Sequence, residues 1–266
     1  MSRTIFLLSI FSVLLAIRAQ AQPGKPSFCC AEIPANQSAW WTFDEPARNT
    51  SADFGGVVNN VGTDVGPVQR VPGKVGRATR YNGISTWVSV PDQTEIDFPG
   101  LCDSGTIEFY VRTTQNSGTV NILDKRDRSV NNLRGYSVYM SNGRLGFQMA
   151  TGPGNVACNT PGSACSNFTS PFQIANGQWH LVAVTFTRCN TPSGTFYVDG
   201  QTLPFTPRIG PLNSVSPLLI GRQATALGSA YFRGDVDELE IFKRAVTRPE
   251  LEQIREARGY GKCRIY

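Results

Sequence analysis

Acidic side chains and one histidine are the residues of this chain whose types could do chemistry. Glycoside hydrolysis needs two carboxyl groups at a defined separation, and the densest acidic run is Asp235–Glu240. In a strand, a period of two sends Asp237 to one face and Glu238 and Glu240 to the other, so these acids do not converge. The single histidine, His180, has no recognisable nucleophile beside it and is expected to be a structural strand residue. These patterns predict that the chain is not an enzyme.

Asp237 is the acid with the most specific hypothesis. It should share a strand face with Leu239 and Ile241, which are expected in the core, and a buried carboxylate needs a cation or another partner. Asp44, at the end of the first expected strand, becomes its neighbour if the first and last strands pair. Two carboxylates, loop carbonyls and water could supply the roughly six to eight oxygen ligands that Ca²⁺ prefers. We therefore predict calcium as a cofactor, bound by Asp44 and Asp237; the alternative is that Asp44 caps a turn and Asp237 pairs with an arginine.

The seven cysteines indicate disulfides and an oxidising compartment. Cys158 and Cys165 bracket a short turn-rich stretch, so a local bridge between them is expected. If the two ends of the chain meet, Cys263 pairs with Cys29 or Cys30. The partners of two others stay open: Cys102 and Cys189. An odd number leaves one thiol over or paired to another chain, and zinc is not expected because the chain has one histidine and no C-x-x-C.

The N-terminus has the features of a signal peptide. Arg3 supplies a positive charge, an apolar run of roughly 13 residues follows, and Ala19–Ala21 is typical of a cleavage site. That run is too short to span a bilayer. The sequence therefore predicts three parts: a signal peptide at 1–21, a cysteine-containing lead segment at 22–35, and one domain at 36–266. The expected location of the mature chain is secreted, either extracellular or periplasmic.

Charge argues against a nucleic-acid partner. The formal net charge is +5, from 25 basic and 20 acidic residues. Losing Arg3 and Arg18 with the signal peptide lowers it to 23 minus 20, or +3. The basic residues are scattered and form no stripe, which is typical of a solvated surface. No segment after the N-terminal run is apolar enough to span a membrane.

The elements that must position these residues are short strands separated by turn residues. Strands are expected at 39–43, 86–90, 106–112 and 181–186, the last covered on both faces. Asn142-Gly143 and Asp199-Gly200 predict type I′ turns, which need positive φ at both central residues. One short C-terminal helix is expected, opened by a capping box of Thr247 and Glu250. Without crossover helices, this pattern indicates an all-β, two-sheet antiparallel sandwich or jelly roll.

Several segments, in this order, carry a family resemblance: 41–45, 73–78, 81–83, 105–111, 177–185, 197–200 and 232–245. Together they resemble the laminin G-like jelly rolls of the concanavalin A-like lectin and glucanase superfamily, from about Trp40 to Arg264. The resemblance implies a secreted jelly roll that binds carbohydrate, protein or another extracellular ligand, often with calcium. It also implies a test for catalysis, because the glucanase branch carries Glu-x-Asp-x-Glu on one strand. Glu95-Ile96-Asp97 begins that pattern, but Pro99 stands in place of the second glutamate and disfavours a central strand.

The predicted function is therefore a secreted, non-catalytic binding module for carbohydrate or another extracellular ligand. One alternative is a protein-binding adhesion or structural module, and the other is a glycosidase or polysaccharide lyase of the same superfamily. The sequence does not identify the ligand-binding residues. Three aromatic residues near expected loops, Trp87, Tyr231 and Phe232, are expected to pack in the core or at strand ends. The run Lys125–Arg128 resembles a family hairpin, whose charges are expected in a solvated turn.

Overall fold

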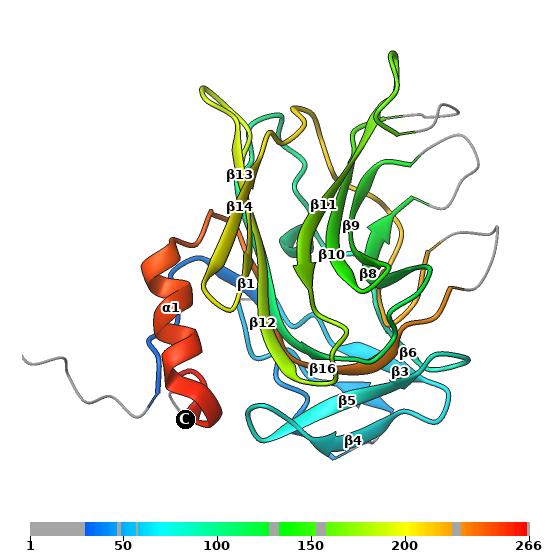
Figure 1. Cartoon of the computed structure of the whole chain (residues 1–266), viewed down its shortest axis with the longest axis vertical. Coiled ribbons are helices and arrows are strands. Elements are labelled where there is room, and N and C mark those ends of the chain that lie inside the picture. The colour runs from blue at the N-terminus through cyan, green and yellow to red at the C-terminus, as the bar shows by residue number, and fades with distance from the viewer. Residues whose placement is uncertain are drawn as a thin grey trace, which may run out of the picture.

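The computed structural model describes most of the chain (Figure 1). The described residues are 30–46, 49–56, 58–127, 133–152, 158–224 and 230–264. The predicted signal peptide at 1–21 and Cys29 lie outside them. No helix in these ranges is long and apolar enough to cross a membrane.

Two antiparallel sheets form the fold, as the strand pattern predicted. The first has the order β14-β13-β12-β7-β16-β5-β4, and β1 also pairs with β16. Its strands are β1 (Gln37–Trp41), β4 (Gln69–Pro72), β5 (Arg77–Asn82), β7 (Gly105–Arg112), β12 (Trp179–Thr187), β13 (Ser193–Val198), β14 (Gln201–Phe205) and β16 (Arg233–Phe242). The first and last long strands are therefore neighbours, which was the condition for bringing Asp44 close to Asp237.

The second sheet has the order β11-β10-β9-β8-β15-β6-β3-β2. Its strands are β2 (Thr50–Ser51), β3 (Gly62–Val65), β6 (Trp87–Val90), β8 (Thr119–Arg126), β9 (Gly135–Ser141), β10 (Arg144–Ala150), β11 (Cys165–Gln173) and β15 (Leu218–Ile220). A short 3₁₀ turn, η1 (Thr94–Ile96), covers the segment where a Glu-x-Asp-x-Glu strand would have been required. That segment is therefore not a strand, as Pro99 predicted.

The core lies between the two sheets and follows the period of two. Ile107, Phe109 and Val111 of β7 point into it. Strand β12 is apolar on both faces because Val182 packs in this core while Leu181 packs in a second cluster beneath the C-terminal helix. Both expected hairpin turns are present, with positive φ at their Asn-Gly and Asp-Gly pairs: Asn142, Gly143, Asp199 and Gly200.

The C-terminal segment covers part of the outer face of the first sheet. Helix α1 (Arg248–Ala257) begins at the predicted capping box, followed by η2 (Arg258–Tyr260). Leu251 and Ile254 pack against Tyr110, whose side chain points away from the main core. Figure 1 shows α1 against the first sheet, on the side away from the second.

Three disulfides join described cysteines: Cys30–Cys263, Cys102–Cys189 and Cys158–Cys165. The first joins the lead segment to the C-terminal tail, where Ala31 also bridges to Lys262. The two ends of the domain therefore meet, and the tail is fixed across the first sheet beyond α1.

Strand β16 departs from simple alternation, and this corrects the expected position of Asp237. The register on β7 shifts between Asp237 and Glu240, and Glu238 adopts φ 52°. Because of this bulge, Asp237 lies opposite Tyr110 on the outer face, while Leu239 still points into the core. Asp237 therefore does not share the face of Leu239 and Ile241.

Candidate functional site

A row of three charged residues crosses neighbouring strands on the outer face of the first sheet. Asp235 of β16 lies directly opposite Arg80 of β5 on one side and Arg112 of β7 on the other. The Asp235 carboxylate is almost fully buried and accepts Nε of Arg80 at 2.8 Å and Nη2 of Arg112 at 2.7 Å. The hydrogen bond to Asp235 raises the pKa of Arg80. The row is thus a carboxylate held between two guanidinium groups.

This row is part of a surface pocket of about 540 Å³, which we call the arginine pocket. Its lining residues are Arg80, Tyr81, Asn82, Arg112, Thr113, Thr114, Gly177, Arg233, Gly234 and Asp235. Arg233 lies two residues before Asp235 on the same strand, opposite Asn82, and its side chain is exposed. The pocket has the size typical of a small-ligand site. Its lining offers guanidinium, amide and hydroxyl donors.

The carboxylates chosen from sequence, Asp44 after β1 and Asp237 in β16, both contact the backbone at the loop between β4 and β5. Oδ1 of Asp44 accepts the N–H of Arg77 at 2.6 Å, and its Oδ2 lies 2.6 Å from Nη2 of Arg264. Oδ2 of Asp237 accepts the N–H groups of Lys74 and Val75 at 2.7 and 2.9 Å. Burial, followed by the charge of nearby Glu238, raises the pKa of Asp237 well above its usual value.

Most of the groups facing these two carboxylates are N–H donors, whereas Ca²⁺ needs oxygen ligands. One carboxylate oxygen, Oδ1 of Asp237, is buried without a hydrogen-bond partner within the described ranges. The same ranges contain no group of three or more acids, histidines or cysteines suited to a metal ion. The surroundings of Asp44 and Asp237 therefore do not fit a calcium ion. The alternative also differs from the structure, because the arginine, Arg264, pairs with Asp44, whereas Asp237 accepts backbone N–H groups. Calcium binding by the chain stays an untested prediction.

A second charged cluster lies further along β16 and is buried; we call it the closed cluster. It consists of Glu108, Glu240 and Lys262, all at most 4 % exposed. Nζ of Lys262 lies 2.8 Å from Glu108 and also pairs with Glu240. Burial raises the pKa of Glu240 to about 8. Burial alone would lower the pKa of Lys262, but the two glutamates raise it well above its usual value.

Glu238 and His180 also have structural partners. Oε2 of Glu238 accepts the indole N–H of Trp40 at 3.0 Å, and its Oε1 lies 3.0 Å from Arg264. The two ring nitrogens of His180 contact Asp199 at 2.6 Å and Asn176 at 2.8 Å. His180 thus links β12 to the adjacent turns, which is a structural arrangement.

The aromatic residues considered from sequence separate into two groups. Phe232 is fully buried in the core. Trp87 and Tyr231 are half-buried on the outer face of the second sheet, with ring centroids 5.9 Å apart. The guanidinium of Arg222 lies 4.6 Å from the Trp87 ring and 5.3 Å from that of Tyr231. Arg222 therefore already occupies part of the face that a sugar ring would need for stacking.

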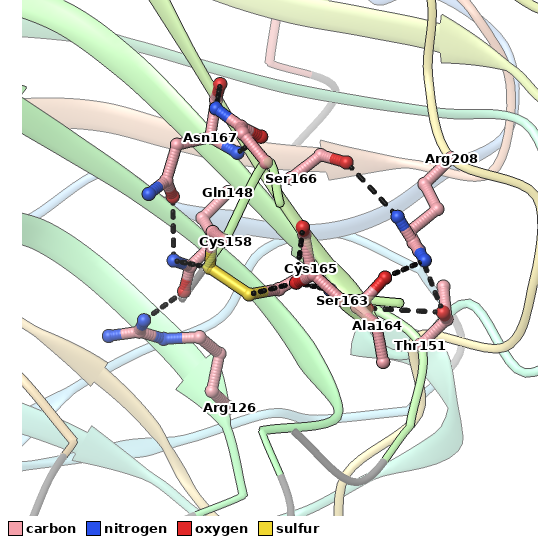
Figure 2. Close-up of a disulfide and its surroundings, with 11 residues drawn as sticks. Arg126, Gln148, Thr151, Cys158, Ser163, Ala164, Cys165, Ser166, Asn167 and Arg208 are labelled. Atoms are coloured by element: carbon pink, nitrogen blue, oxygen red, sulfur yellow. Dashed lines mark hydrogen bonds between the residues drawn. A yellow bond between two sulfur atoms is a disulfide. The ribbon is translucent and has the colours of Figure 1, made fainter. Parts of the chain in front are cut away.

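The Cys158–Cys165 bridge lies beside a polar network on β10 and β11 (Figure 2). Nε2 of Gln148 lies 3.2 Å from Sγ of Cys158 and donates to Asn167 at 2.6 Å. Arg126 donates to the Gln148 carbonyl oxygen and to Asp124. Lys125 and Arg126 are both buried in strand β8, so their charges do not lie in a solvated turn as expected.

The arginine pocket was missed from sequence because its residues lie far apart in the chain. Arg112 ends a strand whose alternate residues are apolar, so its outward direction was predictable. Its neighbours were not, since Arg80 and Asp235 become adjacent only through the strand order β7-β16-β5.

The two sheets define the class of the protein, an antiparallel β-sandwich of the jelly-roll type. Residues 82–252 match the laminin G model of the concanavalin A-like lectin/glucanases superfamily. The chain belongs to this superfamily, which confirms the resemblance seen in its motifs. No curated protein matches the chain in sequence.

Solved structures with a similar fold include three toxin domains. The binding domain of Paraclostridial mosquitocidal protein 1 has a TM-score of 0.64 at 15 % identity, covering 83 % of this chain and 52 % of that one. The binding domain of botulinum neurotoxin DC with SialylT gives 0.60 at 14 %, covering 84 % and 52 %. The ligand-binding domain of botulinum neurotoxin serotype D with N-acetylneuraminic acid gives 0.61 at 10 %, covering 83 % and 50 %. The chain spans about half the length of these structures.

Proposed function

We propose that this chain is a non-catalytic carbohydrate-binding module and that the arginine pocket is its ligand site. The observation that carries the proposal is the set of polar donors that converge there. Arg80, Arg112 and Arg233 supply N–H groups and Thr114 adds a hydroxyl, while the Asn82 side chain holds the adjoining turn through Ser85. Sugar hydroxyl and ring oxygens are acceptors for such groups, and few but well-placed polar contacts give a small-molecule site its orientation.

The same pocket argues against the hydrolytic alternative. Asp235 is the one carboxylate among its lining residues, and two arginines hold it. A glycosidase needs a second acid, and a general base needs a carboxylate free to take a proton. Asp237 and Glu238, the acids of the enzyme hypothesis, make the structural contacts described above.

The choice of carbohydrate over protein as the ligand class draws on the fold relatives. Two of them were solved with SialylT and with N-acetylneuraminic acid. Those ligands belong to those proteins, and for this chain they suggest carbohydrate as the first ligand class to test. Three disulfides support a location in an oxidising compartment, which agrees with the export predicted from residues 1–21.

The proposal is tested by screening the full chain on a glycan array and measuring each hit by titration calorimetry. A pocket-filling change, Thr114→Trp, is expected to abolish binding because Thr114 is an exposed lining residue. The matched control is Thr202→Trp, an equally exposed position on edge strand β14. Absence of saccharide binding, or binding that Thr114→Trp leaves intact, would contradict the proposal.

The non-catalytic part needs a separate assay. Incubation with a polysaccharide panel is expected to release neither reducing ends nor unsaturated products. Release that disappears in Asp237→Ala or Glu238→Ala would establish the enzyme alternative instead.

A further inference from the structure

The arginine pocket carries more positive than negative charge. Three guanidinium groups, those of Arg80, Arg112 and Arg233, line it together with the single carboxylate of Asp235. Because arginine stays charged at any physiological pH, the lining has a formal charge of three minus one, or +2. A neutral saccharide would leave this charge without a counter-ion.

Asp235 engages only one edge of each flanking guanidinium. It binds Nε and Nη2 of Arg80 at 2.8 and 3.1 Å, and Nε and Nη2 of Arg112 at 2.9 and 2.7 Å. The Nη1 groups of both arginines are not used in these bonds. The two guanidinium groups are thus held in place by a buried carboxylate, with donors left over on each.

Arg112 is fixed further by an aromatic ring. Its guanidinium carbon lies 4.6 Å from the ring centroid of Trp179, the residue directly opposite it on β12. A cation over an aromatic face is attracted by the ring and loses side-chain freedom. The Arg112 side chain is therefore already ordered in the free protein, so ligand binding loses less conformational entropy at this residue.

Arg233 supplies the third guanidinium, without an ion-pair partner in the part of the chain that the structure describes. Its backbone is held on both sides: the N–H donates to Oε1 of Gln115 at 2.9 Å, and the carbonyl accepts Oγ1 of Thr113 at 2.6 Å. The base of the side chain is therefore fixed while its charged end is exposed.

From this arrangement we infer that the arginine pocket binds an oxyanion, a carboxylate or a sulfate ester, carried by the saccharide. This inference rests on the proposed function and adds the chemical class of the ligand. The planar fork of a guanidinium matches the oxygens of such groups, and charge-assisted hydrogen bonds to them are about twice as strong as neutral ones. An anion also relieves the mutual repulsion of three neighbouring guanidinium groups.

Two pairs of ligands test the inference with the full chain by titration calorimetry. One pair is an oligogalacturonide and its methyl ester, which removes the charge while keeping the sugar backbone. The other is a sulfated oligogalactan and its unsulfated parent. The charged member of at least one pair is expected to bind about tenfold or more tightly than its neutral partner, with an affinity that falls as salt rises.

A matched pair of variants locates the effect. Arg233→Gln removes the charge but keeps an amide donor, so it is expected to weaken binding of the charged ligand by about tenfold and binding of the neutral ligand by much less. Arg144→Gln removes an equally exposed charge at the start of β10 in the other sheet and should change neither. A similar loss in both variants would overturn the inference, because it would reflect only the overall charge of the protein.

The outcomes also separate this inference from the proposed function. A charge preference confined to the uronide identifies a carboxylate, one confined to the galactan identifies a sulfate, and either supports the inference. Equal binding of charged and neutral members overturns it while leaving the carbohydrate-binding function standing. No binding by any of the four, together with no hit on the glycan array, overturns both.

Discussion

The closed cluster and the arginine pocket are built on the same two strands, β7 and β16, yet they have opposite character. In the closed cluster, two carboxylates share one ammonium beneath the C-terminal tail. In the arginine pocket, two guanidinium groups share the carboxylate of Asp235, and a third, that of Arg233, lines the same surface pocket. The Lys262 side chain is 1 % exposed, whereas the Arg80 side chain is 49 % exposed.

Under the proposed function, one sheet face serves stability at one end and ligand binding at the other. A buried charge without its partner costs several kcal/mol, while an exposed one costs little. The closed cluster should therefore be sensitive to mutation and pH in the folding equilibrium. The arginine pocket should be sensitive mainly in binding.

The largest effect is expected for Lys262→Met, which removes the ammonium and keeps an apolar stem of similar length. Glu108 and Glu240 then lie buried without a cation, and the free energy of unfolding should fall by about 3–5 kcal/mol at pH 7. Urea denaturation measures this. Removing the ammonium raises the pKa of both carboxyls further, and the free energy needed to protonate them falls as pH falls, so the loss should be smaller at pH 5; an equal loss at both pH values would contradict the role given to Lys262.

The next effect concerns the disulfide that holds the tail over the closed cluster. Replacing Cys30 and Cys263 by serine is expected to cost about 3 kcal/mol or more, because this bridge closes most of the chain into one loop. The control is the Cys158→Ser and Cys165→Ser pair, whose short loop should cost about 2 kcal/mol. Thermal melts of both variants measure which bridge contributes more stability. A larger loss in the Cys158 and Cys165 variant would contradict the expected order.

The pH dependence of stability provides a third test. Burial raises the pKa of Glu240 from 4.5 to about 8, so between these values the folded state binds more protons than the unfolded state. Stability contributed by this group therefore falls as pH rises from about 4.5 to about 8. Glu108, Glu238 and Lys262 surround it, and the Lys262 ammonium keeps its charge throughout because its pKa is raised.

Glu240→Gln isolates that contribution. Melting temperatures measured from pH 5 to pH 9 should decline less steeply with pH in this variant than in the parent chain. A parallel decline in the two proteins would show that the slope comes from other groups. Glu252→Gln, which changes a half-buried carboxylate of α1 paired with Arg255, serves as the control.

The smallest effect on stability is expected in the arginine pocket. Asp235→Asn weakens pairs whose arginines are half-exposed, so the loss should be about 1 kcal/mol, and Arg233→Gln should change stability by less than about 0.5 kcal/mol. Urea denaturation of these variants beside Lys262→Met measures the contrast between the two regions. If Asp235→Asn destabilised the protein as much as Lys262→Met, the proposed contrast between the two regions would be wrong.

Much of the fold was predictable because its signals are local. The apolar alternation along 106–112 placed Ile107, Phe109 and Val111 inward, and the Asn-Gly and Asp-Gly pairs specified two hairpins. The capping box at Thr247 and Glu250 likewise gave the start of α1. Each of these depends on backbone preferences within a few neighbouring residues.

The candidate site was not predictable in the same way. Sequence singled out Asp237 as an acid needing a partner but placed it on the wrong face, because the bulge at Glu238 has no clear sequence signal. It proposed Cys29 or Cys30 for Cys263 without choosing between them. The convergence of Arg80, Arg112 and Arg233 gave no signal at all.

The sequence by itself thus determined the β-sandwich class, its superfamily, its hairpins and the capped helix, since strand periodicity and turn chemistry act over short stretches of chain. The tertiary structure alone decided which charges meet. Strand order and register bring together residues more than a hundred positions apart, and burial then decides which of those charges need a partner. On β16 this separates Glu240, buried against Lys262, from Asp235, which is buried between two arginines that themselves reach the surface.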